Sequence, residues 1–339
     1  MRALVIAKHG PPEVMVVQER PDPSPGPGEV RIAVKAAGIN LADLLARLGL
    51  YPDGPKPPCV VGYEVAGEVN AIGDGVEGIS EGDRVMAGTR FGGYAELVVA
   101  PAGGVLPLPD SWSFEEGAAF PVVYATAYAA LLRYGSLRQG ERLLVQAAAG
   151  GVGIACTQIA KHAGAEVFGT ASASKHDAIR GFGVDHAIDY RSRDFAKEVR
   201  RITGEKHPLD LIVDGIGGRS FKQGYSLLNA GGRLVCIGAS AVMQGEDRNL
   251  PRALRTLASM PRFNPLRMMS QSRAVIGLNM LRIWDAHGAS PEDMAALSEL
   301  VATGVLKPVV AEAFPLERGG DAHRFVAERK NVGKVVLTV

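Results

Sequence analysis

The fold is decided by the stretch LLVQAAAGGVG at residues 143–153. Three apolar residues run directly into a glycine-rich turn and a helical pattern follows, an order that predicts the strand, turn and helix of a dinucleotide-binding unit. Gly150 and Gly151 carry no Cβ that would keep a pyrophosphate from the backbone, and Gly153 lets the helix lie close to the sheet. The helix N-terminus would face the phosphates with free N–H groups. Because Ala148 replaces the first glycine of the strict GxGxxG pattern, a glycine turn unrelated to nucleotides is the alternative.

The next strand indicates which nucleotide is bound. It covers residues 166–171, EVFGTA, and runs on into Ser172 and Lys175. An enzyme that prefers NAD usually has Asp or Glu at the end of this strand to bind the ribose hydroxyls, whereas no carboxylate appears here before Asp177. Since hydroxyl and ammonium groups attract a 2′-phosphate, the sequence favours NADPH. The alternative for Lys175 is an ordinary solvated lysine on a helix surface.

Composition narrows the class of protein. The chain has 339 residues, enough for two domains. Its formal net charge of +1 gives no overall field for nucleic acid or anionic membranes. No apolar run approaches the roughly 20 residues of a membrane span, and no secretory cleavage site follows the N-terminal MRALVIAKHG. Three scattered cysteines, Cys59, Cys156 and Cys236, are what a reduced, cytoplasmic protein would have.

The order of the expected elements divides the chain into two parts. Short apolar runs broken by Gly, Pro and Asp indicate a partly closed β structure up to about residue 120. From there to about residue 284 strands alternate with helices, which predicts an α/β fold with a doubly wound parallel sheet. The six expected strands are residues 143–145, 166–171, 186–190, 209–216, 233–240 and 274–278. A helix at 290–304 and a last strand at 334–339 are expected to pack back on the N-terminal part.

Several further motifs resemble one known family in order and spacing. They are GINLAD, ARLGLYP, VVGYEVAGEV, GDRV, GGYAE, FPVVYATAY, AAAGGVG and NVGKVVL. Together they make the chain similar to the medium-chain dehydrogenases/reductases, specifically the zinc-free quinone oxidoreductase branch. FGTASASKH and RTLASMPRF…RAVIGLNM are especially similar to the vesicle amine transport protein subfamily. The resemblance implies a mostly-β, GroES-like catalytic domain of residues 1–120 plus 285–339, around an inserted Rossmann domain of residues 121–284.

The chain departs from the zinc-dependent members of that superfamily. Asn40 stands at the position of the zinc-binding cysteine, and the motif GHE has become Gly62-Tyr63-Glu64. The four closely spaced cysteines of the structural zinc lobe are also missing. Because zinc needs about four N, S or O ligands in a tetrahedral array, we expect no metal.

The resemblance implies that NADPH transfers hydride to a quinone or to an α,β-unsaturated carbonyl compound, whose π-system accepts hydride at carbon without a metal. It assigns Asn40 and Thr126 to the nicotinamide side of the cofactor, with Leu278 and Asn331 lining the nicotinamide pocket. It also assigns Lys175 and Tyr190 to the 2′-phosphate, with Ser172 nearby. The remaining cofactor-binding residues expected are Ala149, Gly150, Gly151, Val152, Thr170 and Gly238.

The residue that acts on the substrate is less sharply indicated. Tyr51 can donate a hydrogen bond from a neutral phenol, and we take Tyr51 and Asn40 as the catalytic candidates, although Tyr51 could equally be a packed loop aromatic. Tyr63 is interpreted as filling the place of the zinc site. Asp43 and Arg47 are one helical turn apart, so an i,i+4 ion pair is the simplest expectation for them. Solvent is a further possible proton source.

Two other functions remain open on the sequence. The first is a non-catalytic NADPH-binding protein that carries or senses lipid, and the second is an enoyl-thioester reductase, since that chemistry occurs on the same fold. The choice between enzyme and lipid carrier concerns residues 241–273, where apolar side chains alternate with six arginines: Arg248, Arg252, Arg255, Arg262, Arg267 and Arg273. This segment is interpreted as a solvated amphipathic helix, a mobile flap over the cleft or a surface for anionic lipid, with prolines that break it into short helices.

The resemblance also implies how the chain assembles. Family members pair through edge strands of the Rossmann sheet, and residues 274–278 are short, apolar and expected near that edge. Since an exposed edge associates unless it is covered, we expect a symmetric homodimer. Quinone or enone substrates are the other expected partners.

Overall fold

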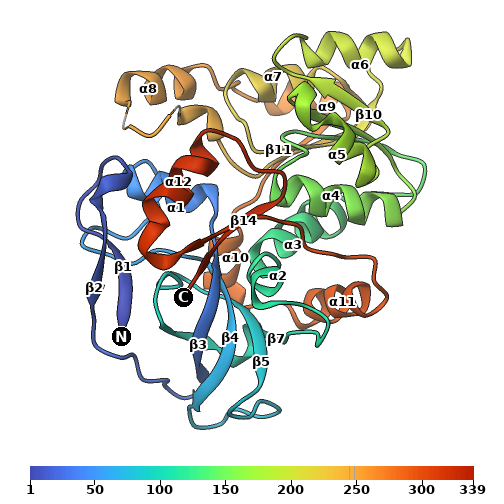
Figure 1. The fold of residues 1–339 in the computed structure, drawn as a ribbon. Coiled ribbons are helices and arrows are strands. Elements are labelled where there is room, and N and C mark those ends of the chain that lie inside the picture. Colours follow the sequence, from blue (N-terminus) through green and yellow to red (C-terminus); the bar gives the residue numbers. More distant parts are fainter. Residues whose placement is uncertain (244, 248) are drawn as a thin grey trace.

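The computed structural model describes residues 1–243, 245–247 and 249–339. Two large sheets dominate it (Figure 1). Arg248, one of the six arginines in residues 241–273, lies outside the described residues. Among those that are described, no helix is both long and apolar enough to cross a bilayer.

One sheet is six-stranded and entirely parallel, with the order β10-β9-β8-β11-β12-β13. Its strands are β8 (Arg142–Val145), β9 (Glu166–Ala171), β10 (His186–Asp189), β11 (Leu209–Asp214), β12 (Leu228–Cys236) and β13 (Ala274–Gly277). Strand order reverses between β8 and β11, as in a doubly wound Rossmann sheet. The expected α/β fold and all six expected strands are therefore confirmed.

The bounds of two strands differ from expectation by more than one residue, and one of them, β12, ends at Cys236 rather than at residue 240. β11 ends at Asp214, two residues early, because the Asp214 carboxylate accepts hydrogen bonds from the N–H groups of Ile216 and Gly217 and turns the chain. β12 begins at Leu228, which pairs with Leu209 before a register irregularity. The glycines at 231 and 232 look like a turn in sequence but lie within this strand.

Helices cover the parallel sheet and connect its strands (Figure 1). They are α4 (Gly151–His162), α5 (His176–Gly181), α6 (Phe195–Thr203) and α7 (Arg219–Tyr225). Between β12 and β13 lie α8 (Leu250–Ala258) and α9 (Pro265–Gln271). Pro251 and Pro265 each stand in the first turn of these short helices, which confirms that the segment forms short pieces.

The second sheet has the order β14-β15-β3-β4-β5-β7, with β6 also paired to β3. Its strands are β3 (Glu29–Gly38), β4 (Glu64–Ile72), β5 (Arg84–Gly88), β6 (Leu97–Pro101), β7 (Val105–Pro107), β14 (Val310–Pro315) and β15 (Lys334–Thr338). A hairpin of β1 (Arg2–Ile6) and β2 (Met15–Glu19) and the helices α1 (Leu41–Arg47), α2 (Phe114–Ala118) and α12 (Gly319–Ala327) pack around it. Both ends of the chain thus build this mostly-β part (Figure 1).

The last segment of the chain, with the expected helix at 290–304 and strand at 334–339, packs only partly on the N-terminal part. β15 pairs antiparallel with β3, so the last strand does join the N-terminal sheet. The helix α11 (Pro291–Ala302) instead buries Leu297 in the core that contains α3 (Pro121–Tyr128). The expectation that this helix packs on the N-terminal strands is wrong, because its apolar face meets α3, which is apolar on most of its surface.

Candidate active site

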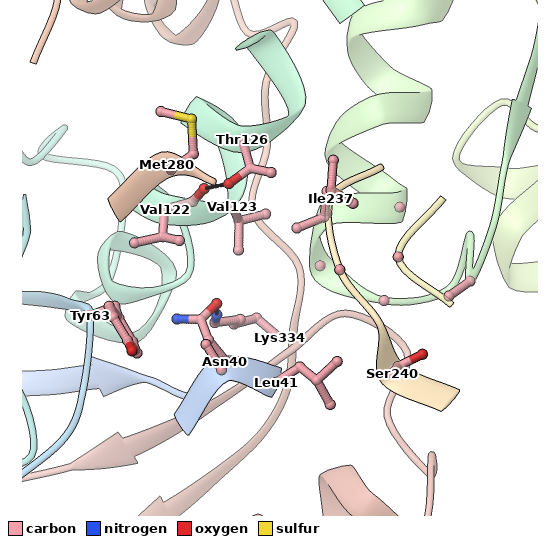
Figure 2. A pocket seen from close by; sticks show the side chains of 18 of the residues that line it. Asn40, Leu41, Tyr63, Val122, Val123, Thr126, Ile237, Ser240, Met280 and Lys334 are labelled. Atoms are coloured by element: carbon pink, nitrogen blue, oxygen red, sulfur yellow. Dashed lines mark hydrogen bonds between the residues drawn. The ribbon is translucent and has the colours of Figure 1, made fainter. Parts of the chain in front are cut away.

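A cavity of about 470 Å³ lies between the two sheets. Val145, Val213 and Gly238 contribute to it from the carboxyl ends of parallel strands, at the point where strand order reverses, which is where ligands bind in open α/β sheets. Figure 2 shows the start of α3 with Val122, Val123 and Thr126 on one side, facing Asn40, Leu41 and Lys334 on the other. We call this cavity the cleft.

The glycine turn forms one wall of the cleft. Gly150 caps α4, and a Cβ there would have only the Ala147 carbonyl oxygen nearby, at 3.4 Å, so the backbone is open to a ligand. A Cβ on Gly153 would lie 2.5 Å from that same oxygen, so Gly153 is required for close packing, here against the turn itself. The free N–H groups at the N-terminus of this twelve-residue helix suit a phosphate.

Two buried polar atoms of the cleft have no hydrogen-bond partner among the described residues, namely Gln146 Nε2 and the Tyr63 hydroxyl. Gln146 leads into the glycine turn, and its Oε1 accepts a 2.6 Å hydrogen bond from Thr170 Oγ1. Buried polar atoms are normally paired. A polar ligand in the cleft would supply the partners that these two atoms lack. The residues therefore fit a dinucleotide.

A buried triad of polar side chains stands opposite the glycine turn. Lys334 Nζ lies 2.5 Å from Glu64 Oε1 and donates a 2.6 Å hydrogen bond to Asn40 Oδ1. Asn40 Nδ2 in turn donates to Glu64 Oε1 at 2.9 Å. Because lysine only donates and a carboxylate only accepts, the Asn40 amide is fixed in one orientation. One N–H of Asn40 and one of Lys334 are left without an acceptor in the part of the chain that the structure describes.

Glu64 connects this triad to α3. Its Oε2 accepts a 2.8 Å hydrogen bond from the Val122 N–H in the first turn of that helix, where an anion is favourable. Thr126 lies one turn further along and donates to the Val122 carbonyl oxygen at 2.6 Å (Figure 2). Sequence reasoning missed Glu64 and Lys334, although both stand in the quoted motifs VVGYEVAGEV and NVGKVVL.

The position of Asn40 is set from behind by Asp43. The Asp43 carboxylate accepts hydrogen bonds from the N–H groups of Asn40 (2.7 Å) and Gly62 (3.0 Å) and from the Tyr94 hydroxyl (3.0 Å). Burial raises the pKa of Asp43 to about 7, although these hydrogen bonds act to lower it. Asp43 thus holds the start of α1 and the Gly62 loop together, while the Asn40 side chain bonds to Glu64 and Lys334 at the wall of the cleft.

The expected ion pair between Asp43 and Arg47 is wrong. Both side chains are fully buried, and Arg47 donates to the carbonyl oxygens of Gly10 and Glu246 instead. The i,i+4 rule applies to a solvated helix surface, whereas α1 is packed on both of these sides, so each side chain bonds to neighbouring elements.

Two tyrosines lie at the substrate side of the cleft. Tyr51 and Tyr63 meet edge to face with ring centroids 6.3 Å apart, and Tyr63 also packs on Phe91. Burial raises the pKa of both phenols above the usual value, so both stay neutral donors. The Tyr63 hydroxyl has no hydrogen-bond partner in the part of the chain that the structure describes, which makes Tyr63 a second substrate-contact candidate beside Tyr51.

The residues expected at the 2′-phosphate lie outside the cavity lining but close to one another. Lys175 Nζ donates to the carbonyl oxygens of Arg329 (2.7 Å) and Asn331 (2.5 Å). Burial raises the pKa of Tyr190, but hydrogen bonds from Arg329 and Arg191 outweigh it, so the net direction is downward. The structure thus adds two guanidinium groups to the expected Lys175 and Tyr190. Arg329 could not be found by local reasoning, since it comes from the loop before β15.

The other expected residues fall into three groups. Nine line the cleft: Asn40, Tyr51, Thr126, Gly150, Gly151, Val152, Gly238, Leu278 and Asn331. Ala149 and Thr170 support the turn from outside it. The Ala149 carbonyl oxygen accepts from Gly333 N–H, and the buried Thr170 hydroxyl accepts from Ala147 N–H. Ser172 is buried, with its hydroxyl 3.3 Å from that of Ser174.

Comparison with known proteins shows which family the chain belongs to. A model of zinc-binding dehydrogenases matches residues 182–337, and a model of the alcohol dehydrogenase GroES-like domain matches residues 26–110. The chain is 39% identical to the synaptic vesicle membrane protein VAT-1 homolog of Danio rerio, covering 99% of this chain and 70% of that protein. The chain belongs to the medium-chain dehydrogenase/reductase superfamily. It is an oxidoreductase of that superfamily, as its sequence motifs indicated.

Solved structures of the superfamily include two informative neighbours. The quinone oxidoreductase of Escherichia coli, complexed with NADPH, has a TM-score of 0.86 and 29% identity, with all of both chains covered. The CurK enoyl reductase has a TM-score of 0.84 and 27% identity, with 99% of this chain and 98% of that one covered. The fold is thus one that holds a nicotinamide cofactor in a solved relative.

The matched family name implies zinc, but the side chains of the cleft do not fit it. Zinc takes sulfur, imidazole or carboxylate ligands in a tetrahedral array. The cleft offers the Asn40 amide and the Tyr63 phenol at the two altered positions, and the Glu64 carboxylate is already paired with the Lys334 ammonium group. No group of three or more His, Cys, Asp or Glu side chains suited to a metal occurs among the described residues. We therefore derive no step through a metal.

Proposed function

We propose that this protein is an NADPH-dependent reductase of quinones or α,β-unsaturated carbonyl compounds. The observation that carries the proposal is the pair of N–H donors that Asn40 and Lys334 leave unused at the cleft wall. They stand opposite a glycine turn suited to a pyrophosphate. Donors of this kind stabilise an oxygen on which negative charge develops.

The binding of the cofactor follows from the chain's own groups. The glycine turn and the N-terminus of α4 would hold the pyrophosphate, and Lys175, Tyr190, Arg191 and Arg329 would hold the 2′-phosphate. Bound NADPH supplies a hydride. The substrate carbon accepts this hydride and its electron pair, charge moves to the substrate oxygen, and a proton from solvent or a neighbouring phenol completes the reduction.

The roles of the polar side chains are distinct. Asn40 and Lys334 would orient the substrate oxygen or the adjacent ribose and stabilise the developing charge. Glu64 keeps both donors pointing at the cleft, and Asp43 holds the backbone of Asn40. Tyr51 and Tyr63 would lie against the substrate ring and offer neutral O–H donors. The apolar side chains of Leu41, Val122 and Leu278 would exclude water.

Turnover tests this proposal directly. NADPH oxidation is followed with a panel of quinones, enals and an enoyl-pantetheine thioester. Asn40→Ala should lower kcat/KM for quinones about a hundredfold, as removal of one oxyanion donor does. Asn249→Ala is the matched control, because Asn249 is an exposed N-cap of α8 that does not line the cleft. Reduction of the thioester alone would favour the enoyl reductase alternative, and NADPH binding without any turnover would favour the lipid carrier.

We further propose that the protein acts as a cytoplasmic homodimer. β13 is the last strand of its sheet and has no partner on its outer side among the described strands. An open edge of this kind pairs readily with a second copy.

A further inference from the structure

A second cavity, of about 320 Å³, lies on the far side of α10 (Met280–His287) from the cleft. Its walls come from α3 with the π-helical turn that follows it (Ala129–Arg133), from α10, and from the start of α11. Both cavities fall in the size range of small-molecule sites. We call this second space the α10 cavity.

Two side chains line both cavities. Met280 and Trp284 are one turn apart on α10, and each borders the cleft on one side and the α10 cavity on the other. On the facing helix, Thr126 lines the cleft while its neighbour Ala125 lines the α10 cavity. In Figure 2 Met280 stands at the α3 side of the cleft, near Val122 and Thr126. Because methionine has an unbranched, flexible side chain, the wall between the two cavities contains a side chain that can change rotamer without movement of the backbone.

One side of the α10 cavity is apolar and is formed by Ala125, Ala129, Ile283, Met294 and Leu297. Polar and ionisable side chains also line the cavity, namely Arg133, Tyr134, His287, Ser290, Glu292 and Asp293. At the exposed rim, Arg133 forms a 2.8 Å ion pair with Asp293 and donates to Ser290 Oγ at 2.9 Å. Since the rim arginine already has its counter-charge, the cavity is suited to an uncharged, apolar group rather than to an anion.

α10 itself is held firmly between the two cavities. Asp53, from the loop that carries Tyr51, forms an ion pair with Arg282 and accepts a 3.0 Å hydrogen bond from Asn279 Nδ2. Arg90 forms a two-pronged ion pair with Asp285. The helix is thus fixed to the mostly-β part, and its side chains Met280 and Trp284 form a wall that the two cavities share.

We propose that the α10 cavity is a subsite for the hydrocarbon tail of a ring substrate whose reacting end lies at Asn40 in the cleft. The inference rests on the proposed reductase function and narrows its substrate class to quinones or enones with an alkyl or isoprenoid chain. The tail would leave the cleft between α3 and α10, pass Met280 and Trp284, and lie along Ala125 and Leu297. The ring would stay beside the donors of Asn40 and Lys334.

Ala125→Leu tests the subsite, because the larger side chain would fill the α10 cavity next to α3 without altering the cleft residues. The probes are a dimethoxy-methyl-benzoquinone without a tail and the same ring with a decyl tail. Ala295→Leu is the matched control, since Ala295 is exposed on α11 and lines neither cavity. Binding to the NADP⁺-loaded protein is read from quenching of Trp284 in a Trp112→Phe background, which leaves Trp284 as the sole remaining one of the chain's two tryptophans.

The tailed quinone should half-quench Trp284 at a concentration at least about tenfold below that of the tailless ring, since burial of a few methylene groups supplies that much affinity. Ala125→Leu should remove this advantage and raise KM for the tailed quinone alone, whereas Ala295→Leu should change neither. Equal concentrations for the two quinones, or a tail advantage that survives Ala125→Leu, would overturn the subsite. Failure of the proposed function is distinguishable, because it would appear as absence of NADPH oxidation with every quinone whatever the quenching shows.

Discussion

Glu64 and Lys334 form an ion pair inside the wall of the cleft, with Lys334 Nζ 2.5 Å from Glu64 Oε1 and both side chains almost completely shielded from solvent. Glu64 comes from the start of β4 and Lys334 from the start of β15. The pair therefore ties β15, near the end of the chain, to β4 within the mostly-β sheet, beside Asn40.

Breaking this pair on one side should be costly. Lys334→Met leaves the Glu64 carboxylate buried without its counter-charge, and we expect a loss of about 3–5 kcal/mol in the free energy of unfolding. Adding Glu64→Gln should recover most of that loss, because the unpaired charge is then removed. Urea denaturation of the parent, the single and the double variant measures this. Equal stability of the single and double variants would show that the loss does not come from the unpaired Glu64 charge.

Cofactor choice should depend on Lys175. We expect the parent to bind NADPH more tightly than NADH, and Lys175→Ala to lose most of that preference. One charge-assisted hydrogen bond contributes roughly 1.5–3 kcal/mol, which is about tenfold to a hundredfold in affinity. Lys197→Ala, at an exposed position on α6, is the control. Titration of both nucleotides provides the measurement, and equal affinities in the parent would contradict a 2′-phosphate site.

The contribution of Asp43 to the free energy of unfolding should decrease as pH rises. Burial raises the pKa of Asp43 in the folded state to about 7, above its ordinary 3.8, so the folded protein holds this proton more tightly than the unfolded chain does. Between these two values the contribution of Asp43 to stability therefore decreases as pH rises, by up to about 1.4 kcal/mol per pH unit.

Asp43→Asn removes this titration. The unfolding free energy of the parent, measured relative to the variant in urea, should decline from about pH 4 to pH 7 and then level off. A relative stability that increases over the same range would show that the three hydrogen bonds to Asp43 outweigh its burial.

Assembly through β13 can be tested at Gly277, which ends this strand. Gly277 is exposed and a Cβ there would meet nothing within 4 Å, so Gly277→Glu adds a charge to the edge without a clash in the subunit. We expect the parent to have twice the mass of the chain in light scattering and Gly277→Glu to dissociate at least about tenfold more readily, since charges on a strand edge oppose pairing. Gly103→Glu is a matched control with equally free surroundings. A monomeric parent at micromolar concentration would rule out the dimer.

Turnover should not depend on the exposed apolar side chains of α8 and α9. Leu254, Leu266 and Met269 are between 66% and 75% exposed, and none of the described residues of 241–273 lines the cleft. The combined change of all three to serine should therefore leave NADPH oxidation unchanged, which a flap over the cleft would not. Sedimentation with anionic vesicles separates the two remaining interpretations. Binding that is lost in the variant indicates a lipid surface, and no binding by the parent indicates a solvated face.

The sequence by itself determined the architecture. The glycine turn and the alternation of strands with helices are local patterns. The strands form where these patterns predict them, because hydrophobic periodicity and turn residues act over a few positions. Gly153 was expected to let the helix lie close to the sheet; close packing does require it, but the backbone that a Cβ would meet is that of the turn at Ala147 and Ala148.

Only the tertiary structure decided how the polar groups of the cleft are paired. Asn40 and Lys334 are 294 positions apart in the chain, and their hydrogen bond exists because β15 returns to pair with β3. Arg329 reaches the neighbourhood of Tyr190 through that same return. The i,i+4 spacing of Asp43 and Arg47 suggested an ion pair, but packing on both sides of α1 directed each side chain elsewhere. Helix spacing describes which side chains are neighbours, whereas burial, which depends on the whole fold, decides which partners they bond.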